Sequence, residues 1–361
     1  MNQPLRFPAV YCPLPTLMHP DVEEIGRISW ERFTSSGVMA ETPEKLEYHR
    51  SQDQHLWISQ GYANGIAERV IIVTQFFYCS NWEDHVCDDA GPLAKNPGEV
   101  STLATHLHRA MERPYQAPAK DEAWTRAHQD ACRRFAEEGA TNAQVARFTT
   151  AWRAYFLGLI CELALKARPE PASLNDFMVA RLQCGLLAPF ATLLDWADGY
   201  EVPAEDFASP AVQALIEMTT ILICWDNDFF SRNKEHVRDG RVGPAHNLVE
   251  ILAYHENVTD DEALAQAVGM RDRVMVRFLE LGAQLKEHAG TEVQRYVDGL
   301  GNMVRTNIDW SHTTARYLNP RNLATFSLPD PAHRYSDKPA NTTPGPLPIP
   351  CIAWWWDDLL G

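Results

Sequence analysis

The apolar residues of this chain recur with the period of an α-helix along most of its length. From Val145 to Ala167, and again from Leu174 to Trp196, they occupy positions i, i+3, i+4 and i+7 over many turns. The sequence contains no alternating pattern long enough for a useful strand and no internal repeat. We therefore expect residues 21–320 to form an all-α domain, a single bundle of about ten or more helices.

The two ends of the chain differ from this helical part. Residues 1–20 are rich in proline and are predicted to form an irregular N-terminal arm. Residues 321–361 contain repeated prolines, which break any helix, and they end in the letters AWWWDDLLG. Adjacent tryptophans on a free tail would lower solubility. We therefore expect the Trp cluster of this Pro-rich C-terminal tail to dock on the body.

Composition and charge narrow the class of partner. With 45% hydrophobic and 22% charged residues, the chain has the profile of a soluble globular protein. Its net charge of -16 repels nucleic acid backbones and anionic lipid, so we expect no nucleic acid partner and no stable membrane insertion. An anionic substrate would need metal cations or local Arg and Lys side chains that reverse the field at one site.

Cellular location is also suggested by the sequence. No basic start followed by an apolar run is seen in MNQPLRFPAV, and no apolar stretch approaches the ~20 residues that span a bilayer. The eight cysteines are scattered without a CxxC pair, which favours reduced thiols in the core over a zinc or redox site. We expect a cytoplasmic protein.

A row of oxygen donors follows a buried-looking segment. Asn227, Ser231 and Glu235 stand at i, i+4 and i+8, and each such step rotates by only ~40° around a helix, so the three side chains share one face. Amide, hydroxyl and carboxylate oxygens are the ligands that Mg²⁺ prefers. Lys234 lies nearby and could meet a phosphate oxygen. The spacing alone does not separate this metal site from a solvated polar face.

A second acidic cluster, NWEDHVCDD, ends another apolar helix. Asp84 and Asp88 stand at i and i+4 and share a face, while Glu83 and Asp89 flank them. Like charges this close repel one another unless a cation is bound. Taken by itself, the cluster is explained at least as well by an acidic helix end exposed to water.

Together these stretches resemble the bacterial class I terpene synthases, or terpene cyclases. That family carries an aspartate-rich motif on one helix and an N-D-x-x-S-x-x-x-E motif on a facing helix. The second motif matches residue for residue at Asn227, Asp228, Ser231 and Glu235. The resemblance implies the class I terpenoid synthase fold with a central active-site cavity. It also implies that Asn227, Ser231 and Glu235 bind one Mg²⁺ and that Lys234 contacts a diphosphate.

The first motif departs from the family pattern of two adjacent aspartates followed by an acid. In one register, Asp84, His85 and Asp88 form the motif with His in second place. In the other register, Glu83 and Asp84 are the pair, and Asp88 is the distal acid after one extra residue. Helix geometry favours the first register and the adjacent acidic pair favours the second. Glu83, Asp84 and Asp88 are therefore all candidate metal ligands.

Further matches surround these motifs. The segment FMVARLQCG places Arg181 where the family has its diphosphate-sensing arginine and Gly185 where a helix break supplies a backbone carbonyl, with Cys184 in the linker between them. Near the end of the bundle, WSHTTARY resembles the family's terminal Arg-Tyr pair, here Arg316 and Tyr317, which closes over the diphosphate. Each residue taken alone also has an ordinary structural explanation.

The resemblance implies a reaction and a cavity wall. Three Mg²⁺ ions with Arg181, Lys234 and Arg316 would bind the diphosphate of a linear prenyl substrate and help it leave. Aromatic faces stabilise the resulting cation by ~0.5–2 kcal/mol each. The candidates for that wall, each of which could equally be core packing, are Phe76, Phe77, Phe177 and Trp310, beside Cys184.

Substrate length and assembly are expectations from the family. A C15 substrate, farnesyl diphosphate cyclised to a sesquiterpene, is expected first, and C20 geranylgeranyl diphosphate, used by a diterpene cyclase, is the main alternative. A head-to-tail prenyltransferase would carry aspartate-rich motifs on both helices, which the Asn, Ser and Glu set argues against. A catalytically impaired binding protein of the same fold is the other rival. A homodimer would fit the family.

Overall fold

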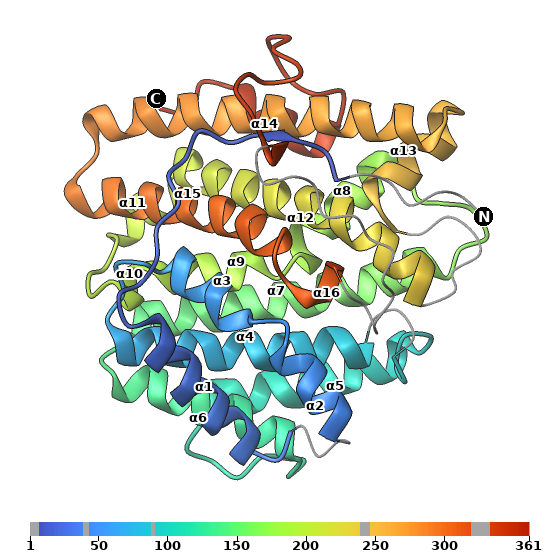
Figure 1. Ribbon diagram of the computed structural model, residues 1–361. Helices are drawn as coiled ribbons and strands as arrows, with labels where there is room; N and C mark the ends of the chain where they lie inside the picture. Colours follow the sequence, from blue (N-terminus) through green and yellow to red (C-terminus); the bar gives the residue numbers. More distant parts are fainter. Residues whose placement is uncertain (1–6, 39–42, 88–90, 239–245, 319–332, 361) are drawn as a thin grey trace.

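The computed structural model describes residues 7–38, 43–87, 91–238, 246–318 and 333–360. Helices account for nearly all of this part of the chain, as the helical period predicts (Figure 1). The first half contributes α1 (Val22–Ser35), α2 (Pro43–Arg50), α3 (Gln54–Gly61), α4 (Ala67–Cys87), α5 (Pro97–Glu112), α6 (Ala123–Glu137), α7 (Asn142–Lys166) and α8 (Leu174–Cys184). The second half contributes α9 (Leu187–Ala191), α10 (Leu194–Ala197), α11 (Ala204–Phe207), α12 (Pro210–Arg238), α13 (Leu248–Glu256), α14 (Asp260–His288), α15 (Thr291–Ser311) and α16 (Ala315–Leu318).

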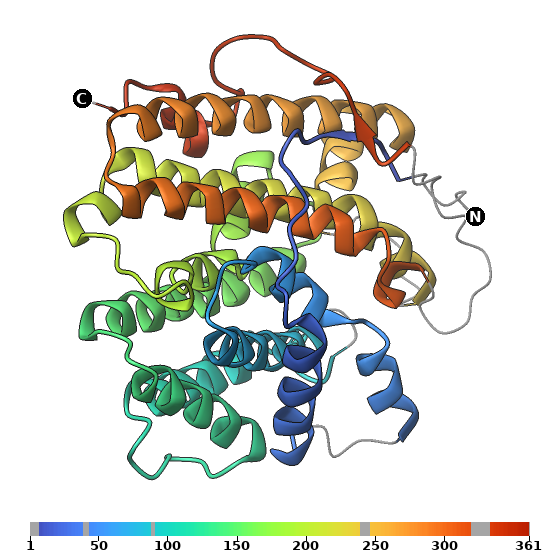
Figure 2. The ribbon, with the colours of Figure 1, turned by 60° about the vertical axis from the view of Figure 1, so that its left-hand side comes forward.

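The long helices pack side by side around α12 and α4. In Figure 1, α14 lies above α12 and α15, and α4 lies below them with α1, α5 and α6; the turned view in Figure 2 shows the same order. Helix α12 contacts α14, α15 and α9, while α4 contacts α1, α3 and α6. Both helices that carry the predicted motifs are therefore covered on several sides, and their exposed faces are narrow.

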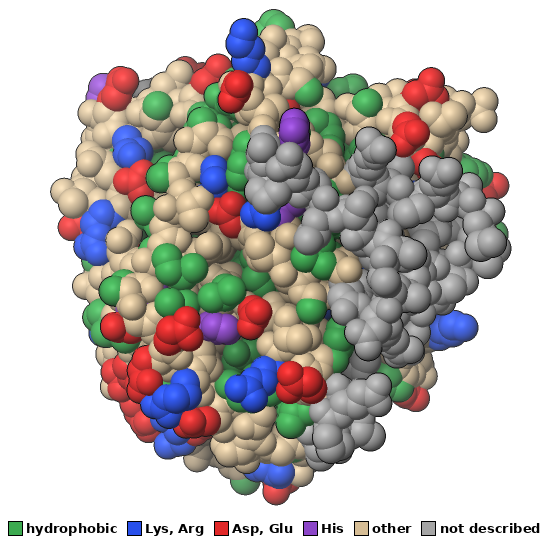
Figure 3. Space-filling model, in the orientation of Figure 1, with side chains coloured by type: hydrophobic (Ala, Val, Ile, Leu, Met, Phe, Trp, Pro, Cys, Tyr) green, Lys and Arg blue, Asp and Glu red, His purple; other side chains and the backbone are tan. Residues whose placement is uncertain are grey.

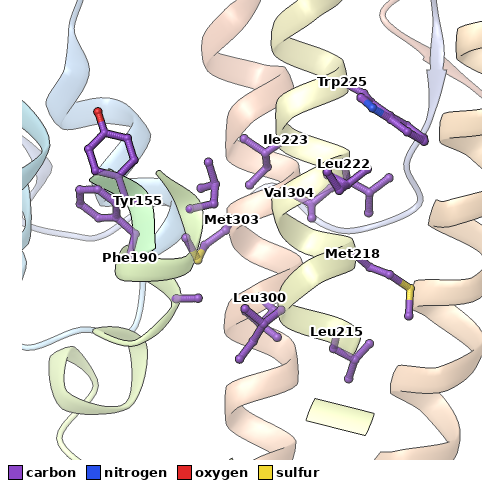
Figure 4. Close-up of a cluster of buried hydrophobic side chains, with 14 of the residues drawn as sticks. Tyr155, Phe190, Leu215, Met218, Leu222, Ile223, Trp225, Leu300, Met303 and Val304 are labelled. Atoms are coloured by element: carbon purple, nitrogen blue, oxygen red, sulfur yellow. The ribbon is translucent and has the colours of Figure 1, made fainter. Parts of the chain in front are cut away.

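Apolar side chains fill the space between α12 and α15. In Figure 4, Leu222 of α12 lies beside Val304 of α15, Leu215 and Leu300 lie further along the same two helices, and Met218 points from α12 away from α15. All five side chains are buried. Burying a side chain of this size stabilises a fold by about 1.5–3 kcal/mol relative to leaving it exposed. This packing fixes the apolar side of α12 and leaves its polar residues to face elsewhere.

The second periodic segment, residues 174–196, is interrupted. Helix α8 ends at Cys184, and Leu186 takes a left-handed conformation with φ 61° before α9 begins at Leu187. Gly158 of α7 lies against this end of α8, where an added Cβ would come within 2.4 Å of the Gln183 Cβ and 2.5 Å of the Cys184 nitrogen. The missing side chain therefore lets α7 and α8 approach closely at the break.

The arm and the tail meet on the outside of the bundle. The short strand β1 (Val10–Tyr11) pairs in parallel with β2 (Tyr335–Ser336), with Val10 opposite Tyr335. In Figures 1 and 2 the arm, in dark blue, crosses α14 and α15 before it reaches α1. Two residues from each end of the chain thus form the sheet that the described residues contain.

The end of the tail packs against three helices. Its 3₁₀ helix η2 (Pro350–Trp356) buries Trp355, whose indole Nε1 donates a hydrogen bond to Glu217 of α12 at 2.7 Å. Arg277 of α14 donates to the Trp355 carbonyl at 2.7 Å, and Asn175 of α8 accepts the Cys351 amide at 3.0 Å. The tryptophan cluster lies away from the cavity described below, because none of its residues lines it.

No single helix in the described part of the chain is long and apolar enough to cross a membrane. One bent pair, Leu174–Cys184 with Leu187–Ala197, passes the test of length and composition together, with a bend of 42°. Core residues of this pair, among them Phe177, Met178 and Phe190, are buried against the rest of the bundle. Their apolar character is therefore accounted for by packing.

Candidate active site

A cavity of about 150 Å³ lies where α4, α8, α9, α12, α15 and α16 meet. It brings together residues from across the sequence. Among those predicted from the sequence, its lining contains Phe77, Asp84, Arg181, Cys184, Gly185, Asn227, Trp310, Arg316 and Tyr317. The other lining residues are Trp57, Ser80, Asn81, Tyr155, Leu186, Leu187, Phe190, Ile223, Cys224 and Asn307.

Helix α4 presents one polar edge to this cavity. Phe77, Ser80, Asn81 and Asp84 all line it, and their spacing of i, i+3, i+4 and i+7 places them on a single helix face. Asp84 is thus the acid that the structure brings to the cavity. Asp88, one turn further along the same face, lies outside the described residues.

Glu83 does not lie on the cavity side of α4. Adjacent residues on a helix point about 100° apart, so Glu83 faces the outer helix α6 instead. Its carboxylate Oε1 lies 2.9 Å from Nε2 of His128, and both side chains are fully buried. Burial raises the pKa of Glu83, and the nearby His128 opposes part of that rise. The geometry therefore turns Glu83 away from the cavity and Asp84 into it, whereas Asp88 lies outside the described residues.

Helix α12 contributes Ile223, Cys224 and Asn227 to the opposite wall. The Asn227 amide nitrogen donates a hydrogen bond to the Tyr317 hydroxyl, and its Oδ1 accepts one from Arg181 at 3.4 Å. Ser231 lies one turn further along α12 and is buried. The predicted amide and hydroxyl donors therefore follow one another along a single face of α12.

Among the described side chains of α12, the predicted Ser231 and Lys234 are not part of the cavity lining. Lys234 is buried with 3% of its surface exposed, so it does not extend into solvent. Glu235 lies within the helix, but its side chain is outside the described residues. Their predicted contacts with diphosphate and Mg²⁺ stay predictions.

Arg181 of α8 reaches across to α12. Its Nη2 donates to Asp228 Oδ1 at 2.5 Å and lies 3.4 Å from Asn227 Oδ1. Burial by itself would lower the pKa of Arg181, but the carboxylates of Asp228 and Glu162 and the other groups around it together outweigh this effect, and the pKa is raised. The guanidinium is therefore charged, nearly buried, and held beside the predicted ligand.

Arg316 of α16 pairs with an acid of α4, as Arg181 pairs with an acid of α12. Its Nη2 donates to Asp84 Oδ2 at 2.8 Å. The Asp84 side chain is 42% exposed, whereas the Arg316 side chain is 15% exposed. The next residue, Tyr317, bonds Asn227, so the Arg-Tyr pair connects the two ligand-bearing helices at the cavity. Two charged guanidinium groups thus lie in one cavity of a strongly acidic protein, whose acidic side chains are spread over the surface face in Figure 3.

The break after α8 lies in the cavity wall. Gly185 packs against α12 so closely that an added Cβ would come within 2.2 Å of the Cys224 sulfur. Only glycine allows α8 to approach α12 at this point. Arg181, one turn earlier, depends on that approach to reach Asp228. The sequence prediction of a helix break at Gly185 agrees with this geometry.

Aromatic side chains form part of the wall, but they are not all the predicted ones. Phe77 stacks on Trp57 with ring centroids 5.1 Å apart and meets Phe190 edge-on at 5.5 Å. Phe76, the preceding residue, points away and packs on Phe148 at 4.6 Å. It belongs to the core, because its ring is fully buried and is not among the residues that line the cavity.

Phe177 is the second aromatic prediction that the cavity does not contain. It is fully buried on the far side of α8, where its ring lies 4.7 Å from that of His246. Trp310 does line the cavity and meets Tyr317 edge-on at 5.8 Å. The aromatic side chains of the lining thus come from α3, α4, α7, α9, α15 and α16, and none comes from α8.

Sequence reasoning missed the residues that tertiary packing brings in. Trp57 of α3 donates a hydrogen bond to Asn307 of α15 at 3.2 Å, and Asn307 donates to the Ile223 carbonyl of α12 at 3.3 Å. No local motif marks either residue. Ser80 and Asn81 could have been found, because they stand four and three residues before Asp84 on the same helix face.

The donor chemistry in and beside the cavity suits a hard divalent cation. Asp84 lines the cavity with a carboxylate and Asn227 with an amide oxygen, and Ser231, one turn beyond Asn227, carries a hydroxyl; all are oxygen ligands of the kind that Mg²⁺ takes. In the described part of the chain, no group of three or more His, Cys, Asp or Glu side chains is placed to hold a metal. The described residues therefore fit a site of mixed oxygen donors, in which few carboxylates leave coordination positions for water and phosphate.

Known proteins share this arrangement over nearly the whole chain. A family model described as terpene synthase family 2, C-terminal metal binding, matches residues 81–277, which contain both predicted motifs. Bonnadiene synthase of Allokutzneria albata is 34% identical over 367 residues, covering 98% of each chain. The crystal structure of SVS_A2, a protein from ancestral sequence reconstruction, has a TM-score of 0.85 and 30% identity, and covers 98% of this chain and 99% of that chain.

Other relatives differ in what their names specify. The (+)-T-muurolol synthase of Streptomyces clavuligerus, described as (2E,6E)-farnesyl diphosphate cyclizing, is 32% identical over 278 residues, 76% of this chain and 64% of that one. The diterpene cyclase DtcycA of a Streptomyces species is 27% identical over 376 residues, 99% of this chain and 98% of that one. The likeness therefore extends to relatives of more than one product class.

Proposed function

The chain belongs to terpene synthase family 2, the class I terpene cyclases, and on this premise we propose that it uses Mg²⁺ to ionise and cyclise a linear prenyl diphosphate. Enzymes of this kind are carbon–oxygen lyases that act on phosphates. The observation that carries the proposal is the meeting of Arg181 and Arg316 with Asp84 and Asn227 in one cavity. The positive guanidinium groups, and the oxygen donors that would bind Mg²⁺, would surround a diphosphate from two sides.

The diphosphate is proposed to lie between the two arginines. A guanidinium can bind two phosphate oxygens with parallel hydrogen bonds, which are charge-assisted and directional. Arg181 is already fixed by Asp228, so it offers its remaining N–H groups without reorganisation. Arg316 can turn from Asp84 to a phosphate oxygen, because that carboxylate is partly exposed.

The residues proposed to hold Mg²⁺ are Asp84 and Asp88 on α4 and Asn227, Ser231 and Glu235 on α12. When bound, Mg²⁺ would neutralise charge on the departing diphosphate, which contributes several kcal/mol of transition-state stabilisation. A set of three ions is proposed from the family resemblance. The role of the chain is to present these oxygens from two helices and to keep the leaving group oriented.

The apolar end of the cavity is proposed to hold the prenyl chain. Phe77, Trp57 and Phe190 contact one another there, and aromatic faces stabilise a nearby cation by about 0.5–2 kcal/mol each. Leu186 and Leu187 add apolar surface at the same wall. These side chains would exclude water, which otherwise quenches the allylic cation.

Substrate length has two candidates. We propose a C15 substrate, farnesyl diphosphate, with a sesquiterpene product, as the sequence resemblance suggests. A C20 substrate is the second candidate, because the relative described as a diterpene cyclase aligns over 99% of this chain, whereas the 32% identical relative described as farnesyl diphosphate cyclizing aligns over 76%. Product analysis separates the two.

The test is incubation of the purified chain with Mg²⁺ and C10, C15 or C20 diphosphate, with gas chromatography–mass spectrometry of the products and an assay of released diphosphate. Cyclic products from one substrate are expected, with the Asn227→Ala variant as the inactive control. Longer linear chains from two substrates would indicate a prenyltransferase. No Mg²⁺-dependent diphosphate release from any substrate would indicate a binding protein.

A further inference from the structure

A buried ion pair lies directly behind the metal-binding face of α12. Asp226, the residue before Asn227, accepts two hydrogen bonds from Arg271 of α14, at 2.8 Å from Nε and 3.1 Å from Nη2. The Arg271 side chain is fully buried and that of Asp226 is 1% exposed. Such a pair has a fixed geometry, because its two parallel bonds define both distance and orientation.

The same arginine reaches the N-terminal arm. Its Nη1 donates to the carbonyl oxygen of Tyr11 in β1. The neighbouring Asp272 accepts the Tyr11 amide at 3.2 Å and the amide of Ala340, in the tail, at 2.8 Å. One cluster of side chains on α14 therefore holds the arm, the tail and the ligand-bearing helix together.

The arm touches α12 at a second point. Phe7 packs on Phe230, with ring centroids 4.6 Å apart, and Phe230 stacks on Tyr317 at 5.8 Å. Tyr317 in turn accepts the hydrogen bond of Asn227. Phe7 thus supports, through one intervening ring, the tyrosine that orients a proposed ligand.

The two residues of α12 that these contacts support each come directly before a proposed ligand. Asp226 and Phe230 stand at i and i+4, as do Asn227 and Ser231, so the two pairs form adjacent faces of α12 turned by about 100°. Because both faces belong to one helix, a contact that rotates the first face about the helix axis also rotates the second. The arm, which reaches Asp226 through Arg271 and Phe230 through Phe7, is therefore placed to influence how the oxygens of Asn227 and Ser231 are oriented.

We propose that the arm segment 7–11, fixed by its pairing with the tail, is a clasp that positions the metal-binding face of α12, with Arg271 and Phe7 as its positioning residues. This inference rests on the proposed function, because it assigns the clasp a role in Mg²⁺ binding. Ligand sets need side chains held to within about 0.5 Å, and α12 carries its proposed ligands in the second half of a 29-residue helix.

The test compares clasp variants with matched variants elsewhere. Phe7→Ala removes the ring contact and Arg271→Lys removes the forked geometry while keeping charge. The controls are Phe207→Ala and Arg147→Lys, which change a half-buried ring and the nearly buried Arg147–Asp195 pair far from the ligands. Each variant is first characterised by its thermal unfolding midpoint without ligand.

Two readouts follow: the rise in unfolding midpoint caused by Mg²⁺ with inorganic pyrophosphate, and the Mg²⁺ concentration that gives half-maximal turnover. For Phe7→Ala and Arg271→Lys we expect the rise to fall by half or more and the Mg²⁺ requirement to increase about tenfold, as for other residues that support metal ligands. The controls should lose comparable midpoint without ligand but keep the wild-type response to Mg²⁺.

A wild-type Mg²⁺ response retained in both clasp variants would overturn the clasp and leave the proposed function standing. A wild-type protein that shows neither a midpoint rise nor turnover would overturn the proposed function and this inference with it. Should Arg271→Lys fail to fold, Phe7→Ala still decides, because its half-buried ring contributes less to the core.

Discussion

The two helices that carry the proposed ligands are supported in parallel ways but with different partners. On α4 the residue before Asp84 is Glu83, buried against His128; on α12 the residue before Asn227 is Asp226, buried against Arg271. In both cases a buried acid faces away from the cavity, and its neighbour faces into it. The rotation of each ligand-bearing helix is thus fixed from behind.

The cavity sides of the two helices differ more. The Arg181–Asp228 pair at α12 has side-chain exposures of 13% and 2%, whereas the Arg316–Asp84 pair at α4 has 15% and 42%. A solvent-exposed pair contributes about 0–1 kcal/mol, while removing one partner of a buried pair costs about 3–5 kcal/mol. The α12 side is therefore a fixed platform, and the α4 side is held by a contact that can open.

The partners of the two buried acids, His128 and Arg271, also differ in how they carry protons. His128 places Nδ1 2.8 Å from the Trp124 carbonyl, so that nitrogen carries a hydrogen and donates it. Its Nε2 can then meet Glu83 at 2.9 Å only with a proton between the two groups. Arg271 brings a permanent charge to Asp226 and needs no shared proton. Helix α4 is thus held less firmly than α12, both on its cavity side and on its buried side.

The largest expected effect comes from removing one ligand on each helix. Asn227→Ala and Asp84→Asn should each lower kcat by at least about a thousandfold, because the first removes an oxygen donor from the proposed metal site and the second removes the negative charge of its carboxylate. Product formation under saturating substrate and Mg²⁺ measures this, with exposed Gln183→Ala as control. If Asp84→Asn kept most of its activity, α4 would not supply a ligand and the comparison of the two helices would fail.

The next largest effect is the difference in stability between the variants that remove the two arginines. Arg181→Ala should lower the free energy of unfolding by about 3 kcal/mol, because it leaves Asp228 buried without its arginine. Arg316→Ala should lower it by at most about 1 kcal/mol, because Asp84 is partly exposed. Denaturant unfolding of both variants measures the contrast. Equal losses would show that the α4 pair is as fixed as the α12 pair.

A smaller effect is expected where α8 approaches α12. Gly185→Ala places a Cβ against the Cys224 sulfur, so α8 must shift and carry Arg181 with it. A misplacement of about 1 Å costs on the order of a hundredfold in rate. The double variant Gly185→Ala with Cys224→Ala should recover part of kcat/KM, since it removes the colliding atom. No recovery would mean that the platform depends on something other than this contact.

The smallest effect is expected at Glu83. Glu83→Gln keeps a hydrogen bond to His128, because the Gln amide can donate to Nε2, so turnover and the Mg²⁺ requirement should change by no more than about threefold. Asp84→Asn provides the contrast on the neighbouring residue. A Glu83→Gln variant with greatly reduced Mg²⁺ affinity would restore the register in which Glu83 and Asp84 are the ligand pair.

The sequence predicted what depends on spacing along one helix. Asn227 and Ser231 share a face because of their separation, and the break at Gly185 was expected from the family pattern. The orientation of neighbouring residues was not predictable in the same way. Phe76 and Phe77 are both apolar, and Glu83 and Asp84 are both acidic, so only the positions of Phe148 and His128 on other helices decide which member faces the cavity.

Residues recruited by long-range packing were also beyond the sequence. Trp57 and Asn307 stand 250 positions apart, yet they share a hydrogen bond in the cavity wall. No periodic pattern relates them, because their proximity results from α3 packing on α15. The fold class could be predicted from helical period alone, whereas the wall of the cavity required the packed structure.

The parallel pairing of β1 with β2 has a consequence for synthesis. Tyr11 emerges early from the ribosome, but its partner Ser336 is translated only after both motifs and the Arg-Tyr pair are complete. The nascent chain therefore contains every proposed ligand before it contains the strand β2, whose pairing with β1 is proposed to position them. A polypeptide that stops before residue 335 would contain every proposed ligand but would lack the strand that pairs with β1, so under the proposed clasp we expect its α12 to be less well supported.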